Sequence, residues 1–380
     1  MTELPILERV RRRLAAGTAE ATPSSVAAAL RAEQHVAGSG TVLALVDQLR
    51  SETRGAGPLD PLLATPGVTD VLVNGPDDVY LDRGRGLEKS PVRFADEDAV
   101  RRLAQRLAAQ AGRRLDDASP WVDARLADGT RLHAVLAPLA RPGTLISMRV
   151  PARRSFSVAE LRAAGSLTDE TADILRRVVA ARAAFVVTGG TGSGKTTLLS
   201  ALLAEVDPAE RLVIVEDATE LRPDHPHVVG LEARPANVEG AGLVTVRDLV
   251  RQALRMRPDR LVVGEVRGAE VVDLLAALNT GHEGGCGTLH ANSTQDVPAR
   301  FEALGVAAGL PREAVHSQLA ASLDLVVHLG RGADGTRRVQ QIAVLERDRG
   351  GIVECIPALS AGPAGIERGP GAGRLQQVLD

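Results

Sequence analysis

Short continuous hydrophobic runs recur in the second half of the chain, and stretches with helical spacing separate them. The runs lie at residues 185–188, 212–215, 261–264, 287–290 and 324–329. Apolar runs of this length are typical of strands that are buried on both faces. Because strands alternate here with helical segments, the pattern predicts a mainly parallel sheet with right-handed crossovers.

The first part of the chain has a different pattern. Apolar residues at helical spacing predict helices over 6–14, from Thr22-Pro23 onward, over 41–49 and over 98–111. Shorter stretches predict strands at 68–73, 79–82, 124–126, 131–136 and 144–150. A second, smaller α/β domain therefore precedes the parallel sheet.

Changes in composition divide the chain further. Glycine and proline interrupt it after residue 55, a polar stretch follows Pro151, and the segment after residue 360 is rich in both residue types. The predicted parts are a helical N-terminal extension (1–55), a smaller α/β domain (56–150), a linker (151–157), the main α/β domain (158–359) and a disordered tail (360–380). The extension is either a solvated helical segment or an arm that docks on a partner.

Composition argues against several classes of protein. The net charge of −3 and the aromatic content of 2% argue against a nucleic-acid translocase or helicase, although such enzymes remain an alternative. Two cysteines cannot form a four-thiolate zinc site or a disulfide framework. Without an apolar run long enough to span a bilayer, or a signal peptide, we expect a cytoplasmic protein that docks on the cytoplasmic face of the membrane.

One glycine-rich motif predicts nucleotide binding. The residues from Gly189 to Thr196 fit G-x-x-x-x-G-K-[ST], a loop whose backbone N–H groups converge on phosphates. A predicted strand precedes the motif and a predicted helix follows it, as this kind of phosphate loop requires. The candidate nucleotide-binding residues are Gly189, Gly190, Thr191, Gly192, Ser193, Gly194, Lys195, Thr196 and Thr197.

Lys195 is unusual in this composition. The chain has 45 lysine and arginine residues, of which only Lys89 and Lys195 are lysines. A compact ammonium can lie between phosphate oxygens, whereas a planar guanidinium favours an outer, bidentate approach. We therefore expect Lys195 to contact the β- and γ-phosphates and the Thr196 hydroxyl to ligate Mg²⁺.

Acidic residues follow two of the predicted buried strands. Glu216 and Asp217 end the run at 212–215, and Glu265 follows the run at 261–264. Ligands of open parallel sheets bind at the carboxyl ends of the strands, so Glu216 could hold Mg²⁺ through water and Glu265 could polarise the hydrolytic water. The alternatives are a helix-capping or loop pair for Glu216 and Asp217, and a solvated strand-end residue for Glu265.

The segment over 280–293 is rich in glycine and leads into a further predicted strand, which ends at His290. His290 could donate to a γ-phosphate and His282 could respond to its surroundings, in a segment that glycine makes flexible. A histidine at a strand end is also a common structural feature, and this interpretation stays open.

Together these motifs resemble those of the type II/type IV secretion ATPases, most closely the Tad/Flp pilus-assembly (CpaF-like) branch. The resemblance covers roughly residues 58–345. Its strongest stretches are VVTGGTGSGKTT, LVIVEDATEL, LRMRPDRLVVGEVRG and LNTGHEGGCGTLHANS, in the order of the family's Walker A, Asp box, Walker B and His box. The upstream stretches WVDARLADGTRLHAVL and LISMRV are similar to the family's N-terminal domain.

The resemblance implies a RecA-like P-loop NTPase core, a PAS-like N-terminal domain and a hexameric ring that binds ATP and Mg²⁺ between the two domains. By matching position, Glu265, Glu216 and His290 belong to the catalytic motifs. Arg131 and Arg149 match arginines that reach towards the phosphates, although they could be ordinary arginines of a sheet surface. The four-cysteine zinc site of related pilus-extension ATPases is absent, which favours the Tad or conjugative branches.

The function that follows is an ATP-hydrolysing motor, partnered by integral-membrane platform proteins, for Flp/Tad-type pilus assembly or type II/IV-like protein secretion. The close alternative is the ATPase of a conjugative DNA-transfer machine, because the two share their chemistry. A non-hydrolysing scaffold is a further alternative, which the complete set of motifs disfavours.

Overall fold

The computed structural model describes residues 6, 9–10, 13–14, 22–33, 38–53, 55–84, 86–151, 155–237, 240–281, 283–332, 334–362 and 365–380. Two compact units divide the chain, Met1–Pro151 (unit 1) and Ala152–Asp380 (unit 2), and each is described by itself. The division falls at the beginning of the segment that the sequence predicts as a linker.

Unit 1 begins with helices that bury a small core of their own. Helix α2 (Pro23–Ala32) starts after Thr22, whose hydroxyl accepts from the Ser25 backbone N–H in a reciprocal capping box. Helix α3 (Ser39–Thr53) covers the helix predicted over 41–49. Both contribute buried residues such as Leu30 and Leu49 to this core. Most of the helix predicted over 6–14 lies outside the described residues.

The rest of unit 1 is an antiparallel sheet with one long helix. The elements are η1 (Gly57–Leu59), α4 (Asp60–Leu63), β1 (Asp70–Asn74), β2 (Val79–Asp82), β3 (Leu87–Lys89), α5 (Glu97–Gln110), β4 (Trp121–Arg125), β5 (Arg131–Val135) and β6 (Leu145–Arg149). In the described residues the six strands run in the order β3-β2-β1-β6-β5-β4. The apolar side of α5, with Val100, Leu103 and Leu107, shares its core with the sheet.

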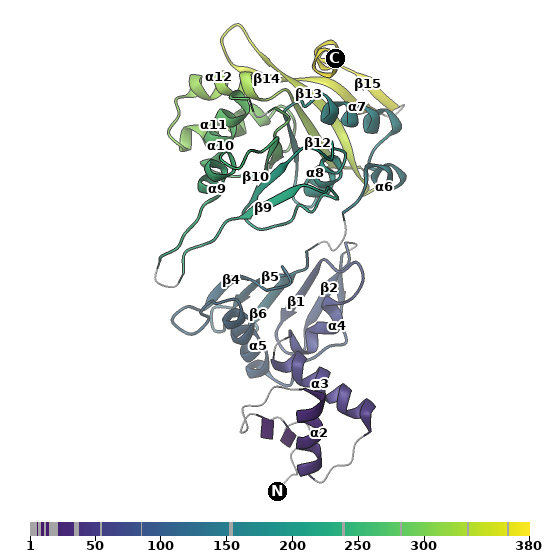
Figure 1. The fold of residues 1–380 in the computed structure, drawn as a ribbon, viewed down its shortest axis with the longest axis vertical. Coiled ribbons are helices and arrows are strands. Elements are labelled where there is room, and N and C mark those ends of the chain that lie inside the picture. Colours follow the sequence, from purple (N-terminus) through teal and green to yellow (C-terminus); the bar gives the residue numbers. More distant parts are fainter. Residues whose placement is uncertain are drawn as a thin grey trace. The chain divides into compact units, whose positions relative to one another are not determined.

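Unit 2 alternates strands and helices (Figure 1). Its elements are α6 (Val158–Ala163), α7 (Asp169–Ala180), β7 (Phe185–Gly189), α8 (Lys195–Leu203), β8 (Leu212–Glu216), β9 (Val228–Glu232), α9 (Val246–Ala253), β10 (Arg260–Val266), α10 (Glu270–Asn279), β11 (Cys286–Leu289), α11 (Val297–Ala307), α12 (Arg312–Ser322), β12 (Leu325–Arg331), β13 (Arg337–Arg347), β14 (Val353–Gly362), β15 (Gly365–Arg368) and α13 (Ala372–Leu379).

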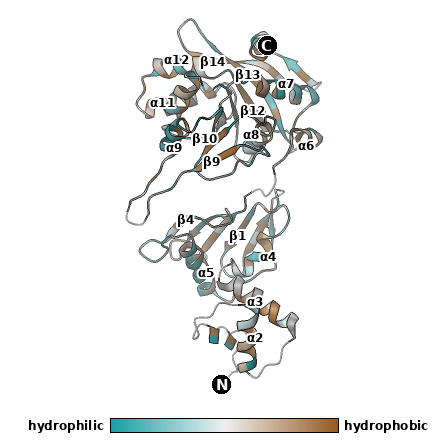
Figure 2. Cartoon of the chain, viewed as in Figure 1, coloured by the Kyte–Doolittle hydropathy of each residue, from teal (hydrophilic) through white to brown (hydrophobic). Residues whose placement is uncertain are grey.

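These strands form one sheet with a core on each face. Among the described residues the nine strands follow the order β15-β14-β13-β12-β7-β11-β10-β8-β9, and β12 through β9 are parallel. Phe185 and Val187 pack with residues of α6, α7 and α8, whereas Val186 packs with residues of α9 to α12. Figure 2 shows hydrophobic strands such as β9 and hydrophilic outer helices such as α9. The prediction of a mainly parallel sheet is confirmed.

The C-terminal part of the sheet is antiparallel and extends further than the sequence predicts. Strand β13 pairs antiparallel with β12, and β14 and β15 continue the sheet. The prediction of a disordered tail over 360–380 is wrong for its described part, which forms the end of β14, then β15 and α13. Leu375 of α13 is buried, and a methyl group on Gly371 would lie 2.8 Å from the Ile356 carbonyl oxygen. Glycine here permits close packing of the backbone.

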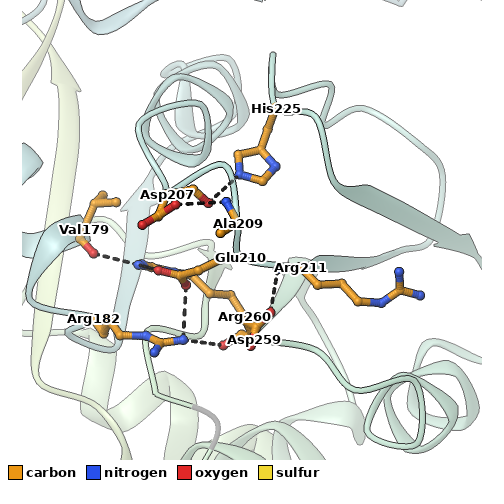
Figure 3. A network of polar contacts seen from close by, with 9 residues as sticks. All are labelled: Val179, Arg182, Asp207, Ala209, Glu210, Arg211, His225, Asp259 and Arg260. Carbon is orange, nitrogen blue, oxygen red and sulfur yellow. Dashed lines mark hydrogen bonds and ion pairs between the residues drawn. The ribbon is translucent and has the colours of Figure 1, made fainter.

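A buried ion pair lies where β10 begins, at the opposite end of the strand from Glu265 (Figure 3). The Arg260 side chain is 3% exposed, and its guanidinium donates to both carboxylate oxygens of Glu210, at 2.7 and 3.1 Å. The same guanidinium donates to the Val179 carbonyl oxygen at 2.9 Å. One arginine thus connects the end of α7, the segment before β8 and the start of β10.

Replacing Glu210 with alanine should therefore lower the free energy of unfolding of unit 2 by about 3 kcal/mol, since it leaves a buried guanidinium without its partner. Urea denaturation of the whole chain measures this. Glu205→Ala is the matched control, because Glu205 pairs with the half-exposed Arg176 and should cost less than about 1 kcal/mol. Equal losses in the two variants would contradict the assignment.

Candidate nucleotide-binding site

The segment between β7 and α8 is a sharp glycine loop. Strand β7 ends at Gly189 and helix α8 begins at Lys195, and between them Gly192 and Gly194 have φ angles of +68° and +98°. A methyl group on Gly189, itself at φ +148°, would lie 2.5 Å from the Leu329 carbonyl oxygen. Glycine is therefore required at Gly189 by packing against β12 and at Gly192 and Gly194 by the left-handed backbone.

The Lys195 side chain is held inside this loop. Its ammonium donates to the carbonyl oxygens of Gly189 and Gly190, at 3.0 and 3.1 Å. Lys195 is 9% exposed, and burial lowers the pKa of its ammonium, while the charge of Glu265 acts in the opposite direction. The ammonium thus lies beside the N-terminus of α8, and the helix dipole favours a bound anion at that end.

The predicted catalytic residues of unit 2 lie at one edge of the sheet. Strand β11 pairs with β7 on one side and with β10 on the other, all parallel, and β8 follows β10. Their carboxyl ends therefore lie together. His290 directly follows β11, Glu265 lies near the end of β10, and Glu216 is the last residue of β8. The structure brings these residues to the edge where the phosphate loop begins, as the sequence predicts.

Glu216 is hydrogen-bonded to the backbone of the turn that follows it. Its carboxylate accepts from the backbone N–H groups of Glu220 and Leu221, each at 3.0 Å. The Thr196 hydroxyl instead donates to Glu220, at 3.3 Å. Glu220 is not among the site residues predicted from the sequence, although its position four residues after Glu216 places it in the same turn.

Burial decides the protonation of Glu216. It is 6% exposed, and burial raises the pKa of its carboxyl to about 7, despite the two backbone N–H donors. Gly264 allows this close packing, since a methyl group there would lie 2.5 Å from the Glu216 Cγ. The carboxyl thus titrates near neutral pH, which is typical of residues at functional sites.

Glu265 is paired with Arg267, which is not among the site residues predicted from the sequence. Its carboxylate accepts from the Arg267 guanidinium, two residues further along the chain, and this hydrogen bond raises the pKa of Arg267. The Glu265 side chain is 25% exposed, so it can reach solvent. Glu265 and Arg267 both lie close enough to Lys195 for their charges to act on the pKa of its ammonium. The site therefore holds both signs of charge beside the phosphate loop.

The segment before His290 is tightly packed in the described residues. A methyl group on Gly287 would lie 2.5 Å from the Val263 carbonyl oxygen, and the Thr288 hydroxyl donates to the Gly264 carbonyl oxygen at 2.7 Å. Close packing against β10 therefore explains Gly287, whereas the sequence pattern predicts flexibility from these glycines. His282 lies outside the described residues. Cys286 is buried, and burial raises the pKa of its thiol to about 12, so it stays unreactive.

The two arginines predicted in unit 1 are neighbours on its sheet. Arg131 of β5 and Arg149 of β6 are direct cross-strand partners, and Arg149 is also opposite Asp70 of β1. The Arg149 Nε donates to Asp70 at 3.0 Å. Direct partners in an antiparallel pair project from the same face of the sheet, so these arginines form one cationic row. Their approach to a nucleotide stays a prediction.

Comparison with known proteins gives the class of this chain. Residues 52–367 match the family described as type II/IV secretion system protein. The chain therefore belongs to this family, which the phosphate loop and the strand-end residues had indicated.

Individual relatives agree with this assignment. The chain is 59% identical over 321 residues to a Mycobacterium tuberculosis protein provisionally named a conjugal transfer protein, covering 83% of this chain and 91% of the relative. It is 33% identical over 314 residues to the type IV secretion system protein VirB11 of Brucella suis, covering 74% and 86%.

Solved structures share the fold. The ATPase DotB of Legionella pneumophila aligns with a TM-score of 0.53 at 20% identity, over 73% of this chain and 77% of that one. The pilus retraction motor PilT with bound ADP aligns with a TM-score of 0.52 at 20% identity, over 82% and 84%. These likenesses support the fold assignment, a RecA-like core preceded by an N-terminal domain.

Two kinds of feature are absent from the described residues. No helix there is long and apolar enough to cross a membrane. Nor does that part of the chain hold three or more His, Cys, Asp and Glu side chains in an arrangement that could bind a metal ion.

Glu216 should make stability depend on pH. Because the folded protein holds the Glu216 proton up to about pH 7 and the ordinary pKa of a glutamate is 4.5, its contribution to stability is complete below pH 4.5 and is lost as the pH rises through 7. Glu216→Gln removes this titration and keeps an acceptor for the backbone donors. As the pH rises from 4.5 to 7, the free energy of unfolding of the variant should increase by about 3 kcal/mol relative to that of wild type.

Denaturant unfolding at pH 5 and pH 8 measures this difference. Glu346→Gln, at an exposed position of β13, is the matched control and should follow wild type at both pH values. If Glu216→Gln also kept the wild-type difference between the two pH values, the burial of a titrating carboxyl at this position would be refuted.

Proposed function

We propose that this chain is an ATP-hydrolysing motor that energises assembly of Flp/Tad-type pili or a type II/IV-like protein secretion machine. The observation that carries the proposal is the shared sheet edge at the carboxyl ends of β7, β10 and β11, where the phosphate loop, Glu265 and His290 lie. A loop that binds phosphates thus has polar side chains beside it on the side where a γ-phosphate would lie.

The phosphate-binding role rests on donors inside the loop. The Lys195 ammonium donates to two carbonyl oxygens of the loop, and it can exchange them for an anionic acceptor, which forms a stronger hydrogen bond. The Ser193 hydroxyl is buried and has no hydrogen-bond partner among the described residues. A buried hydroxyl without a partner is costly, and a phosphate oxygen would satisfy it. Both groups therefore fit an anion.

The oxygen groups beside the loop also fit Mg²⁺, which prefers oxygen ligands and keeps several waters. The Thr196 hydroxyl would bind the cation directly, and the carboxylates of Glu216 and Glu220 would hold it through water. When bound with ATP, Mg²⁺ neutralises phosphate charge.

Each remaining residue has a separate proposed role. Glu265 orients and polarises the attacking water. Before the water binds, Arg267 holds the Glu265 carboxylate in place. His290 donates to the γ-phosphate. Arg131 and Arg149 of unit 1 neutralise negative charge that develops during hydrolysis, as arginine fingers do.

The wider setting of the motor follows from the family. We propose a homo-oligomeric ring, hexameric as the resemblance implies, that works at the cytoplasmic face of the membrane with integral-membrane platform proteins. The 59% identical relative named for conjugal transfer supports the second candidate, an ATPase of a DNA-transfer machine. Genes for small pilins and platform proteins beside this one would favour the first candidate, and genes for a relaxase and a coupling protein the second.

The enzymatic part of the proposal has a direct test. Glu265→Gln should still bind ATP, because Lys195 and the loop are unchanged, but should lose turnover by about 10²- to 10⁴-fold since the group that activates water is gone. Binding of a fluorescent ATP analogue and release of phosphate measure the two properties. Glu346→Gln, an exposed glutamate of β13, should keep both. Normal turnover in Glu265→Gln would remove Glu265 from the mechanism.

A further inference from the structure

Two arginines lie beside the phosphate loop on the side opposite to Glu265 and His290. Arg331 ends β12 and Arg337 begins β13. A methyl group on Gly192 would lie 3.8 Å from an Arg331 guanidinium nitrogen, and one on Gly194 would lie 3.7 Å from the Arg337 Cδ. The hairpin of β12 and β13 thus brings both side chains into contact range of the loop.

The register of the hairpin places the two arginines directly opposite each other. Arg331 and Arg337 are Cα partners, as are Leu329 and Val339 on the same face of the ladder. Leu329 and Val339 are buried in the core that also holds residues of α8. The arginines therefore continue this row beyond the core, on the face of the sheet that carries α8 and the start of the loop.

A β-bulge produces this register. The pairing shifts between His328 and Leu329, so that Gln340 is the extra residue of β13, and the Gln340 amide donates to the Arg331 carbonyl oxygen at 3.5 Å. Gly330 leaves room for the Gln340 side chain, which a methyl group there would meet. Bulges commonly redirect side chains next to functional sites.

Like charges directly opposite each other destabilise an antiparallel pair. In the described part of the chain neither Arg331 nor Arg337 forms an ion pair, whereas the neighbouring Arg338 pairs with Asp334. Both arginines are exposed, and both lie beside a loop whose Ser193 hydroxyl is buried without a partner. An anion bound to the loop would relieve the repulsion.

We propose that Arg331 and Arg337 bind the nucleoside diphosphate part of the nucleotide in the loop. This inference rests on the proposed function, since it needs a nucleotide at the loop. Glu265 lies near the end of β10 and His290 follows β11, both on one side of β7. Arg331 at the end of β12 and Arg337 at the start of β13 lie on the other side. If hydrolysis takes place beside Glu265, the γ-phosphate points to that side. The α- and β-phosphates and the nucleoside then extend towards the guanidinium groups, which bind phosphate oxygens bidentately.

Substitution of the two arginines should affect binding of ADP and ATP alike. The diphosphate part is the same in both nucleotides. Arg331→Gln and Arg337→Gln should therefore each lower the affinity for ADP and for ATP by the same factor, about tenfold for each charge-assisted hydrogen bond that the substitution removes. The double variant Arg331→Gln/Arg337→Gln should lower both affinities further. The ligand-free protein should melt at an equal or higher temperature, because the replacement removes repulsion. A merely structural arginine would lower the melting temperature.

The experiment is titration calorimetry of the full chain with MgADP and with a non-hydrolysable ATP analogue, together with melting temperatures of the ligand-free variants. Arg338→Gln is the matched control: Arg338 lies next to Arg337 in β13, opposite Gly330, and should bind both nucleotides like wild type. If wild type binds no nucleotide, the proposed function itself fails.

If wild type binds and both arginine variants bind equally well, the inference fails and the proposed function stands. Loss of affinity in Arg338→Gln equal to that in Arg337→Gln also overturns the inference, because it would reflect net charge alone. A lowered melting temperature in the ligand-free variants would assign the arginines to the fold. Arg337→Lys should restore part of the affinity, since it restores the charge without the bidentate geometry.

Discussion

The whole candidate site depends on how closely the end of β7 packs against β12. Gly189 has no space for a side chain beside the Leu329 carbonyl oxygen, and this contact sets the direction in which the chain leaves the sheet. The loop can then return through two glycines with positive φ into the N-terminus of α8, where Lys195 is held. The backbone N–H groups of this turn and the helix dipole favour an anion together. A bulkier residue at Gly189 would displace all of them.

Charge is distributed around this loop in an ordered way. Carboxyl groups lie on the β8 and β10 side, where burial raises the pKa of Glu216 to about 7 and Glu265 accepts a hydrogen bond from Arg267. Two arginines, Arg331 and Arg337, lie on the β12 side, directly opposite each other in the register of the hairpin. The opposite ends of the strands carry the buried Arg260–Glu210 pair, which connects β10 with the segments around it. The sheet thus separates the groups that we propose to act on a nucleotide from those that connect its strands at the other end.

The sequence predicts the parts whose signals are local. The phosphate loop, the buried strands and the acids at their ends have patterns that hold whatever the rest of the chain does, and the structure has β7, β8, β10 and β11 where the hydrophobic runs lie. Contacts between distant segments have no such signal. Arg331 reaches the loop only because β12 pairs with β7 and a bulge shifts β13, and Glu220 reaches Thr196 through a turn after β8. The prediction of disorder over 360–380 is wrong for its described part for the same reason. The glycines there permit close packing against β14, whereas a glycine-rich composition alone is typical of disordered segments.

The central claim is that a buried ammonium at the turn of this loop binds the phosphates of ATP, and Lys195→Arg tests it most directly. The variant keeps the charge but replaces a compact ammonium, held on the Gly189 and Gly190 carbonyls, with a larger planar group. Phosphate release and ATP binding by the full chain are measured beside wild type and Lys89→Arg, the exposed lysine of β3. We predict that Lys195→Arg loses binding or turnover while Lys89→Arg keeps both. Wild-type binding and turnover in Lys195→Arg would contradict the claim.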